Sequence, residues 1–532
     1  MLKLLSFSKL ISLLMAIVVI IPIAIIYFSL LNIDYAIWYH LNSFVLPELI
    51  ANTVKLVIGV SLGTIVLGVS LSYINTFFEF RGKKFFTFFA LMPMSIPAYI
   101  MAFVYVALFD TTGLWSLKIK EALALDFFLP SIRNFYGITL VLSLSFYPYV
   151  YLLARNSFLN IGSKAIEATT MLGLSRFETF YRVILPLSGP WILSGLILTL
   201  METLGDFGAV SIFNYSTFTT AIYRSWFGLF SLKTAQQLAS ILISLVSLLM
   251  ILGYVISKNK NFSTVGKSSV SPRTIKVGFI SEIFIILYSS IVSLMAFFIP
   301  LAMIIYWSIY AIKADLDSRF FTFLSNSLEI ATYSVIVIIF FSLTMSYATR
   351  KYQGVIGQLI KNISSLGYAV PGSVLAVGIF IFLNFMDSTF FNGAKIFSGS
   401  ILAMIIGMSI RFLTIGLSPI SNSFLRISNS QLAVLELNQN SKLKNFIKAL
   451  APMIKVSTMS ASLMVFVEVI KEMPISLMTR PFGKETLSIR IFELTSEGEW
   501  ERAALPSLFL IVISLIPTFI LYINTEIKAE KL

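Results

Sequence analysis

Long apolar segments alternate with shorter polar stretches along the whole chain. A helix needs about 20 apolar residues to cross the hydrocarbon core of a membrane. Twelve segments reach this length, with approximate limits 11–31, 54–75, 85–109, 137–154, 188–207, 237–257, 284–310, 328–348, 364–386, 399–418, 457–475 and 503–523. The pattern therefore predicts an all-α, polytopic membrane protein with about twelve transmembrane helices.

The polar stretches between these segments differ in positive charge. If both termini are cytoplasmic, the segments on the inner side carry nearly twice as many Lys and Arg residues as those on the outer side. Cytoplasmic loops of membrane proteins are enriched in these residues. We therefore expect a multi-pass protein of the bacterial cytoplasmic (inner) membrane, with both termini in the cytoplasm.

Two parts of the chain resemble each other. Corresponding positions are ANTVKL at 51–56 and SNSLEI at 325–330, Ser72-Tyr73 and Ser346-Tyr347, Pro97 and Pro371, Pro186 and Pro452, and Glu202 and Glu468. Such self-similarity indicates an internal duplication. We predict a first repeat at 1–256, a polar cytoplasmic linker at 257–277 and a second repeat at 278–532. Each repeat has six spans, so both enter the membrane in the same direction.

Composition narrows the possible chemistry. Of the 532 residues 57% are apolar and 12% charged, there is no cysteine, and His40 is the only histidine. These numbers exclude disulfides, thiolate sites and histidine-based metal sites, so we expect no metal centre, no cofactor and no catalytic residues. The net charge of +14 sits in loops between apolar runs, which argues against nucleic-acid binding.

A long segment between the fourth and fifth spans, 163–190, lies on the predicted cytoplasmic side. Its first part, 165–172, has the pattern of a short helix that Gly173 would end. A second amphipathic stretch, 177–184, follows, and Pro186 should break it. We expect two short helices across the cytoplasmic face, where a partner protein could dock.

The chain contains no complete phosphate-binding loop. This motif requires G-x-x-x-x-G-K-[ST]. Gly266-Lys267-Ser268 has Asn261 at the place of the first glycine, and Gly483-Lys484 is followed by glutamate. Any ATP chemistry would therefore come from another polypeptide.

Four carboxylates lie near the ends of the fifth and eleventh spans. Glu202 and Asp206 are four residues apart, as are Glu468 and Glu472, so each pair shares one helix face. A charge at the bilayer centre costs about 2.5–3.5 kcal/mol on insertion scales, so such groups face a cavity or a partner. Either the four form an acidic collar that attracts a cation, or nearby cations such as Lys471 and Arg480 neutralise them; both readings can hold together.

The cytoplasmic segment resembles the EAA loop of ABC importer permeases of the binding-protein-dependent type. The resemblance rests on Glu167-Ala168, Gly173 and Ile184-Leu185-Pro186. It implies two permease units, at about 50–255 and 324–523, and two copies of a cytoplasmic ATPase subunit. The implied ATPase-coupling residues are Glu167, Ala168, Gly173, Pro186 and Pro452. The second copy of the loop departs from the pattern, because Ala433 stands at the glutamate position.

Three longer stretches are similar to the ferric-iron permeases of the FbpB type, in which two permease units are fused. They are METLGDFGAV at 201–210, TFTTAIYRSWFG at 217–228 and FVEVIKEMPISLMTRPFGKETLSIRIFELTSE at 466–497. This resemblance implies ferric iron as cargo and an extracytoplasmic substrate-binding protein as donor. The implied translocation pathway contains Glu202, Asp206, Glu468 and Glu472. Arg480 would contact the binding protein or act at a gate.

Other functions stay open at this point. The same mechanism could carry thiamine, phosphonate or a polyamine. An ion gradient could drive the chain as a secondary transporter, in which case the purified chain alone would transport. A non-transporting membrane scaffold would tolerate replacement of Glu202 and Glu468.

Overall fold

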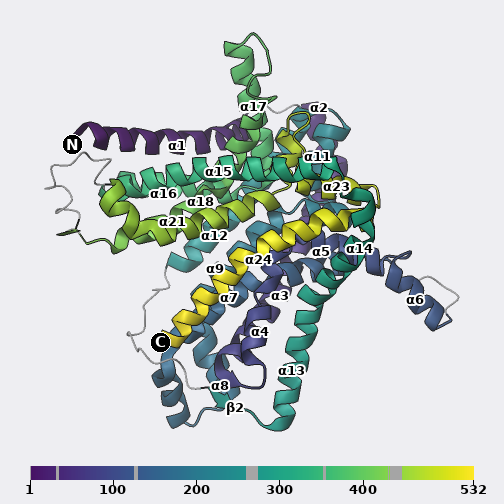
Figure 1. Ribbon diagram of the computed structural model, residues 1–532, viewed down its shortest axis with the longest axis vertical. Coiled ribbons are helices and arrows are strands. Elements are labelled where there is room, and N and C mark those ends of the chain that lie inside the picture. The colour runs from purple at the N-terminus through teal and green to yellow at the C-terminus, as the bar shows by residue number, and fades with distance from the viewer. Residues whose placement is uncertain are drawn as a thin grey trace. The chain divides into compact units, whose positions relative to one another are not determined.

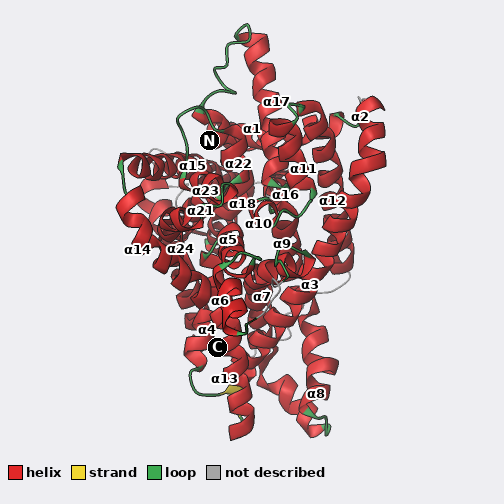
Figure 2. Ribbon diagram, turned by 90° about the vertical axis from the view of Figure 1, so that its right-hand side faces the viewer, coloured by secondary structure: helices red, strands yellow, loops and turns green. Residues whose placement is uncertain are grey.

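The computed structural model describes residues 2–31, 35–124, 130–258, 274–351, 355–428, 430–431 and 446–531. These residues are almost entirely helical (Figure 2). Twelve helical segments in this part of the chain are long and apolar enough to cross a membrane, and each overlaps one of the twelve predicted spans. The prediction of an all-α polytopic membrane protein is confirmed.

The first repeat forms the following elements: α1 (Leu2–Phe28), α2 (Tyr35–His40), η1 (Leu41–Val45), α3 (Leu46–Phe77), β1 (Phe78–Glu79), α4 (Lys83–Phe89), η2 (Met92–Ser95), α5 (Ala98–Phe109), α6 (Leu114–Ala122), α7 (Phe135–Met171), α8 (Arg176–Thr179), η3 (Phe180–Ile184), α9 (Leu185–Gly205), α10 (Gly208–Ile212), α11 (Phe218–Tyr223), η4 (Arg224–Gly228) and α12 (Leu232–Lys258). Most of the predicted linker, 259–273, lies outside the described residues.

The second repeat and the end of the linker form these elements: β2 (Ile275–Lys276), α13 (Phe279–Ser293), η5 (Leu294–Phe298), α14 (Ile299–Asp315), α15 (Ser318–Lys351), α16 (Val355–Ala369), α17 (Gly372–Phe390), α18 (Ile401–Arg426), η6 (Phe446–Leu450), α21 (Ala451–Lys471), α22 (Pro474–Thr479), α23 (Leu487–Ser496) and α24 (Trp500–Lys531). The short strands β1 and β2 pair in parallel.

The helices pack into two compact units that do not follow the order of the chain. Unit 1 contains Met1–Tyr35, Ile222–Ile243 and Asp317–Arg490, whereas unit 2 contains Ala36–Ala221, Ser244–Leu316 and Ile491–Leu532. In unit 1, α1 packs against α15, α16 and α17 of the second repeat (Figure 1). In unit 2, α24 packs against α5 and η2 of the first repeat. Each unit therefore combines helices from both sequence repeats.

Three predicted spans are not continuous helices. The one predicted at 457–475 ends as α21 at Lys471, and α22 starts at Pro474. The other two are interrupted at a proline. The segment predicted at 85–109 consists of α4, η2 and α5, and the segment predicted at 364–386 is divided between α16 and α17. Each later helix starts directly after a proline, and Pro97 and Pro371 have nearly the same backbone angles (φ −54°, ψ 142° and φ −53°, ψ 141°). Proline lacks an amide hydrogen and disfavours helical geometry in the residue before it, so it ends a helix at this point.

Pro186, in contrast, does not break its helix, and this prediction is wrong. The helix is continuous over Arg176–Gly205 because the π-helical turn η3 leads directly into α9, where Pro186 occupies the second position. In the π-helical turn the Leu185 amide donates to the Phe180 carbonyl, and such a local change in hydrogen bonding lets a membrane helix contain a proline without ending. The separate helix predicted at 165–172 is also wrong, because α7 continues without interruption to Met171.

Glycine allows the central helices of each unit to approach closely. In unit 2, where α3, α7 and α9 lie side by side (Figure 1), a Cβ atom on Gly68 of α3 would be 2.8 Å from Val150 Cβ of α7. In unit 1, a Cβ atom on Gly416 of α18 would be 2.8 Å from Ser342 Oγ of α15. Small residues at such contacts let membrane helices pack tightly.

Candidate functional site

The predicted coupling loop has a defined geometry at its turn. After α7 ends, Gly173 adopts a left-handed conformation (φ +75°), and a Cβ atom there would meet nothing within 4 Å. Ser175 then caps α8: its hydroxyl accepts a hydrogen bond from the Glu178 amide (3.3 Å), and the Glu178 carboxylate accepts one from the Ser175 amide (3.0 Å). This reciprocal arrangement fixes the start of the helix.

The same loop exposes apolar side chains. Met171 is 90% exposed, Leu172 78% and Phe177 71%. Exposed large apolar side chains in a connecting loop are suited to contact with a partner protein. Glu167 and Ala168 lie in the last turns of α7, but their side chains are outside the described residues. The loop therefore offers a partner an exposed apolar surface next to a glycine turn.

An aromatic cluster anchors the base of the loop to the membrane helices. The ring of Phe180 lies 4.6 Å from that of Tyr73, and Tyr73 meets Phe158 edge-on at 6.4 Å. In the second repeat the corresponding Tyr347 and Phe424 are again in edge-on contact at 6.4 Å. The tyrosines of the two matched Ser-Tyr pairs therefore make the same aromatic contact in both units.

The second copy of the loop is described only at its end. Residues 432–445, which include Ala433, lie outside the described residues. The π-helical turn η6 leads into α21, and Pro452 occupies the second position of that helix, as Pro186 does in α9. Pro186 and Pro452 therefore hold equivalent positions.

Two of the four predicted pathway carboxylates organise the backbone. Asp206 directly follows α9, and its Oδ1 accepts a hydrogen bond from the Val210 amide of α10 (3.1 Å). Glu472 directly follows α21, and its Oε2 accepts one from the Ile475 amide of α22 (2.9 Å). A carboxylate at the start of a helix satisfies amides that have no helical partner.

The carbonyl groups of the same two residues are held in matching ways. Thr219 Oγ1 donates to the Asp206 carbonyl (2.6 Å), and Ser488 Oγ donates to the Glu472 carbonyl (3.0 Å). The turn after the fifth span and the turn after the eleventh span therefore have the same construction in unit 2 and unit 1.

The charges around the two turns differ. In unit 1, Arg411 Nε lies 3.9 Å from Glu472 Oε1, and Lys471 Nζ lies 3.4 Å from Glu468 Oε1. The prediction that Lys471 neutralises a carboxylate is confirmed, whereas Arg480 pairs with Glu485 of its own loop at 3.9 Å.

The role of Arg411 was not predicted from the sequence, although an arginine inside an apolar span indicates that a counter-charge lies nearby. Glu202 is half-buried, and the acidic collar stays a prediction.

Two asparagines from the repeated ANT/SNS motif hold the loops that follow these turns. Asn52 Nδ2 donates to the Ser216 carbonyl (3.2 Å) in unit 2. Asn326 Nδ2 donates to the carbonyls of Glu485 (3.0 Å) and Gly483 (3.4 Å) in unit 1. The motif therefore connects the second and eighth spans to the site loops.

We expect Asn326→Ala to lower the thermal stability of the protein more than Asn52→Ala. Asn326 is 5% exposed, so its removal leaves two carbonyls without their donor, at a cost of about 1–3 kcal/mol. Asn52 is half-buried and donates to a single loop carbonyl, that of Ser216. Thermal unfolding of both variants in detergent measures the difference, and equal midpoints would contradict the assignment.

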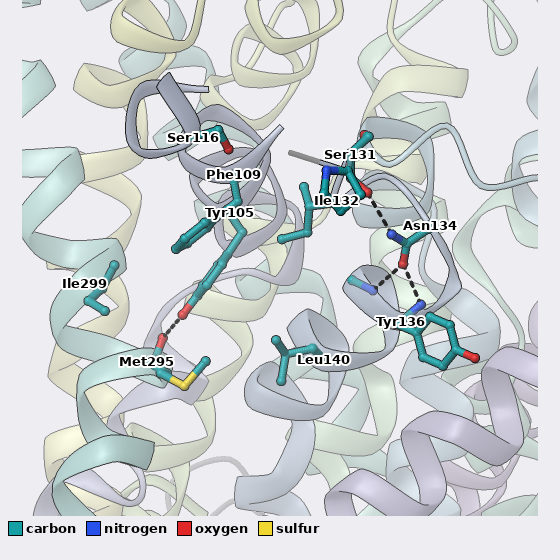
Figure 3. A pocket seen from close by; sticks show the side chains of 12 residues that line it. Tyr105, Phe109, Ser116, Ser131, Ile132, Asn134, Tyr136, Leu140, Met295 and Ile299 are labelled. Atoms are coloured by element: carbon teal, nitrogen blue, oxygen red, sulfur yellow. Dashed lines mark hydrogen bonds between the residues drawn. The ribbon is translucent and has the colours of Figure 1, made fainter. Parts of the chain in front are cut away.

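One cavity of about 540 Å³ lies in unit 2 between α5, α7 and the α13–α14 helix (Figure 3). Two of the polar side chains drawn at its wall are bonded to the protein: Tyr105 Oη donates to the Met295 carbonyl (2.7 Å), and Asn134 Nδ2 donates to the Ser131 carbonyl while its Oδ1 accepts from the Tyr136 amide. An apolar cavity of this kind does not suit a hydrated cation. We therefore place the candidate ion route at the carboxylate turns.

Comparison with known proteins gives a consistent answer. A family described as "Binding-protein-dependent transport system inner membrane component" matches residues 59–260. The Fe(3+)-transport system permease protein FbpB 2 of Haemophilus influenzae is 28% identical over 499 residues, which cover 90% of each chain. The chain is a homologue of these membrane permeases. The resemblance predicted from the sequence is confirmed.

Two further relatives of this permease differ in length. The putative ferric transport system permease protein FbpB 1 of Haemophilus influenzae is 22% identical over 70% of this chain and 60% of its own length. The molybdenum transport system permease protein ModB of the same organism is 26% identical over 213 residues, which are 38% of this chain and 91% of ModB. A complete relative thus aligns with well under half of the permease, as expected if the chain contains two permease units.

Proposed function

We propose that the permease imports ferric iron across the cytoplasmic membrane as the membrane subunit of an ATP-driven system. An extracytoplasmic binding protein delivers the ion, and two copies of a cytoplasmic ATPase subunit supply the energy. The observation that supports this proposal most is the similarity to a ferric permease over 90% of both chains. The chain itself carries out no covalent chemistry.

The exposed turn of the first repeat supports the place proposed for the ATPase. Met171, Leu172 and Phe177 form an apolar surface beside Gly173, and α7 and α9 connect this surface directly to the membrane interior. A force on the turn is therefore transmitted through continuous helices. The predicted topology, with both termini in the cytoplasm, agrees with this role, because it would put the turn on the side where ATP is available.

Within the pathway, we assign different roles to the four carboxylates. Asp206 and Glu472 hold the turns, and their carboxylates are already bonded to backbone amides. Glu202 and Glu468 lie four residues earlier, within α9 and α21, and are half-buried; because Asp206 and Glu472 lie beyond the helix ends, the predicted shared helix faces are wrong. We propose that Glu202 and Glu468 guide the ion. Oxygen ligands suit a hard cation such as Fe³⁺. At the outer end, Arg480 lies next to the fully exposed Phe482, and we propose that both contact the binding protein.

Reconstitution tests the transport function. Proteoliposomes that contain the permease, its ATPase and its binding protein should take up radiolabelled ferric iron only when ATP is present. Uptake by the permease alone under an ion gradient would instead establish a secondary transporter. Competition by thiamine, a phosphonate or a polyamine, with no iron uptake, would move the proposal to that cargo.

We expect Glu202→Gln to reduce iron uptake about tenfold, because charges that line a route raise the local concentration of the ion. Glu468→Gln should reduce it less, about threefold, because Lys471 already compensates part of the Glu468 charge. ATP hydrolysis stimulated by the loaded binding protein should persist. Glu121→Gln is a matched control, since Glu121 is exposed on α6 and belongs to neither turn. Unchanged uptake in both pathway variants would refute their role and favour a scaffold.

A further inference from the structure

Unit 1 contains a buried ion pair where two interrupted spans meet. Arg411 of α18 and Glu472 after α21 have side chains that are 12% and 3% exposed, and their Nε and Oε1 atoms are 3.9 Å apart. Arg411 Nη1 also donates to the carbonyl of Val370 at the break between α16 and α17 (3.3 Å). One guanidinium therefore connects the break at Pro371 with the turn after the eleventh span.

Gly372 makes this arrangement possible. A Cβ atom at Gly372 would lie 2.5 Å from Glu472 Oε1 and 3.0 Å from Arg411 Nη1. Any side chain there would displace the carboxylate, the guanidinium or the start of α17. We call Arg411, Glu472 and Gly372 together the bridge.

The first repeat lacks the residues of the bridge. Aligning Asn156-Ser157-Phe158 with Asn422-Ser423-Phe424 places Ser145 at the position of Arg411, and aligning Pro97 with Pro371 places Ala98 at the position of Gly372. The Ser145 hydroxyl donates to the Val141 carbonyl of its own helix (3.0 Å). The turn at Asp206 therefore has the same backbone construction as the turn at Glu472, but a serine replaces the arginine that would tie it to the break at Pro97.

This difference has a mechanical consequence. Separating a buried ion pair leaves two charges without compensation in a medium of low polarity, which is strongly unfavourable. The turn at Glu472 consequently resists rearrangement. Among the described residues no ion pair is formed by Asp206, and its turn lies in the repeat whose EAA-like loop keeps both Glu167 and Gly173.

We infer that Arg411 is a positioning residue that holds the second repeat fixed, so that the ATP-driven rearrangement takes place around the Asp206 turn of the first repeat. This inference rests on the proposed function. It assigns unequal mechanical roles to two turns that have the same fold.

Variants of the bridge separate this role from simple stabilisation. Arg411→Gln should lower both thermal stability and the amount of iron transported per ATP hydrolysed, the latter about tenfold. In Arg411→Gln with Glu472→Gln no charge is left unpaired, so thermal stability should return close to that of the unaltered protein. Transport per ATP should stay low, with an unchanged KM for the loaded binding protein. Arg411→Lys, which keeps the charge, should recover part of the coupling.

A reciprocal variant introduces the bridge into the first repeat. Ser145→Arg with Ala98→Gly supplies the guanidinium and the space next to Asp206, and should slow transport severalfold without changing that KM. Unaltered coupling in the double glutamine variant, or unaltered turnover in the reciprocal variant, would overturn the inference. Absence of iron transport by the unaltered permease in the complete system would instead refute the proposed function.

Discussion

Gly68→Val should prevent the permease from accumulating as a folded protein. The added Cβ would lie 2.8 Å from Val150 Cβ and 2.9 Å from the Tyr151 amide nitrogen. The nitrogen belongs to the backbone of α7 and cannot rotate away, so α3 and α7 must separate. Overpacking of this kind costs about 1–3 kcal/mol or more. Gly195 of α9 approaches the same turn of α7 from another side, with its added Cβ 2.9 Å from Val150 Cα, so little room is left for adjustment.

The second repeat provides a rescue variant. There the corresponding contact is made by Ser342 of α15 and Gly416 of α18, so the glycine is on the opposite helix. Gly68→Ser with Val150→Gly reproduces that arrangement and should restore folding. The yield of monodisperse protein in size-exclusion chromatography measures both effects. Normal yield of Gly68→Val, or no recovery in the paired variant, would contradict the packing described here.

Gly173→Val should uncouple ATP hydrolysis from transport while the helix bundle stays folded. Gly173 has φ +75°, a conformation that costs residues with a Cβ atom about 1–2 kcal/mol. A Cβ there would meet nothing within 4 Å, so the effect is one of backbone geometry and not of packing. The turn would change shape, and the apolar surface at Met171, Leu172 and Phe177 would no longer fit the ATPase. We expect iron uptake to fall about tenfold.

Matched variants identify the cause. Gly173→Asn should keep most of the uptake, because asparagine tolerates the left-handed conformation. Gly173→Pro and Glu167→Ala should behave like Gly173→Val, as expected for an EAA-type loop. Gly189→Ala is a neutral control, since that glycine has open space and no left-handed conformation. Uptake and ATPase activity measured in the same proteoliposomes give the coupling ratio, and normal coupling in Gly173→Val would exclude this role for the turn.

The sequence was sufficient to predict the membrane spans. Apolar length predicted all twelve membrane helices, because the bilayer imposes that length locally. It also located Pro97 and Pro371 as corresponding residues. Their effect on the helix was not predicted, since a proline interrupts, begins or continues a helix according to the turn before it. Pro186 follows a π-helical turn, whereas Pro97 follows a short 3₁₀ helix.

The pattern of apolar and polar residues did not predict contacts between helices that are distant in the sequence. Glu472 was recognised as a costly intramembrane charge, yet its partner Arg411 is on another span and is brought close by the packing of α18 and α21. The division into units was also not predicted. The sequence predicted a first repeat at 1–256 followed by a second at 278–532. In the structure, α1 and α24 each pack with helices of the other repeat.

Because α1 and α24 pack with helices of the other repeat, neither unit can be completed early in synthesis. The ribosome releases α1 into the membrane long before α15, α16 and α17 exist, so the earliest helix must wait for its neighbours until more than half of the chain has been made. Unit 2 is likewise incomplete until α24 is inserted. A nascent permease therefore passes through a long stage with unsatisfied helix faces, in which quality-control proteases can recognise it. Messages truncated near the 3′ end should consequently yield no stable half-protein.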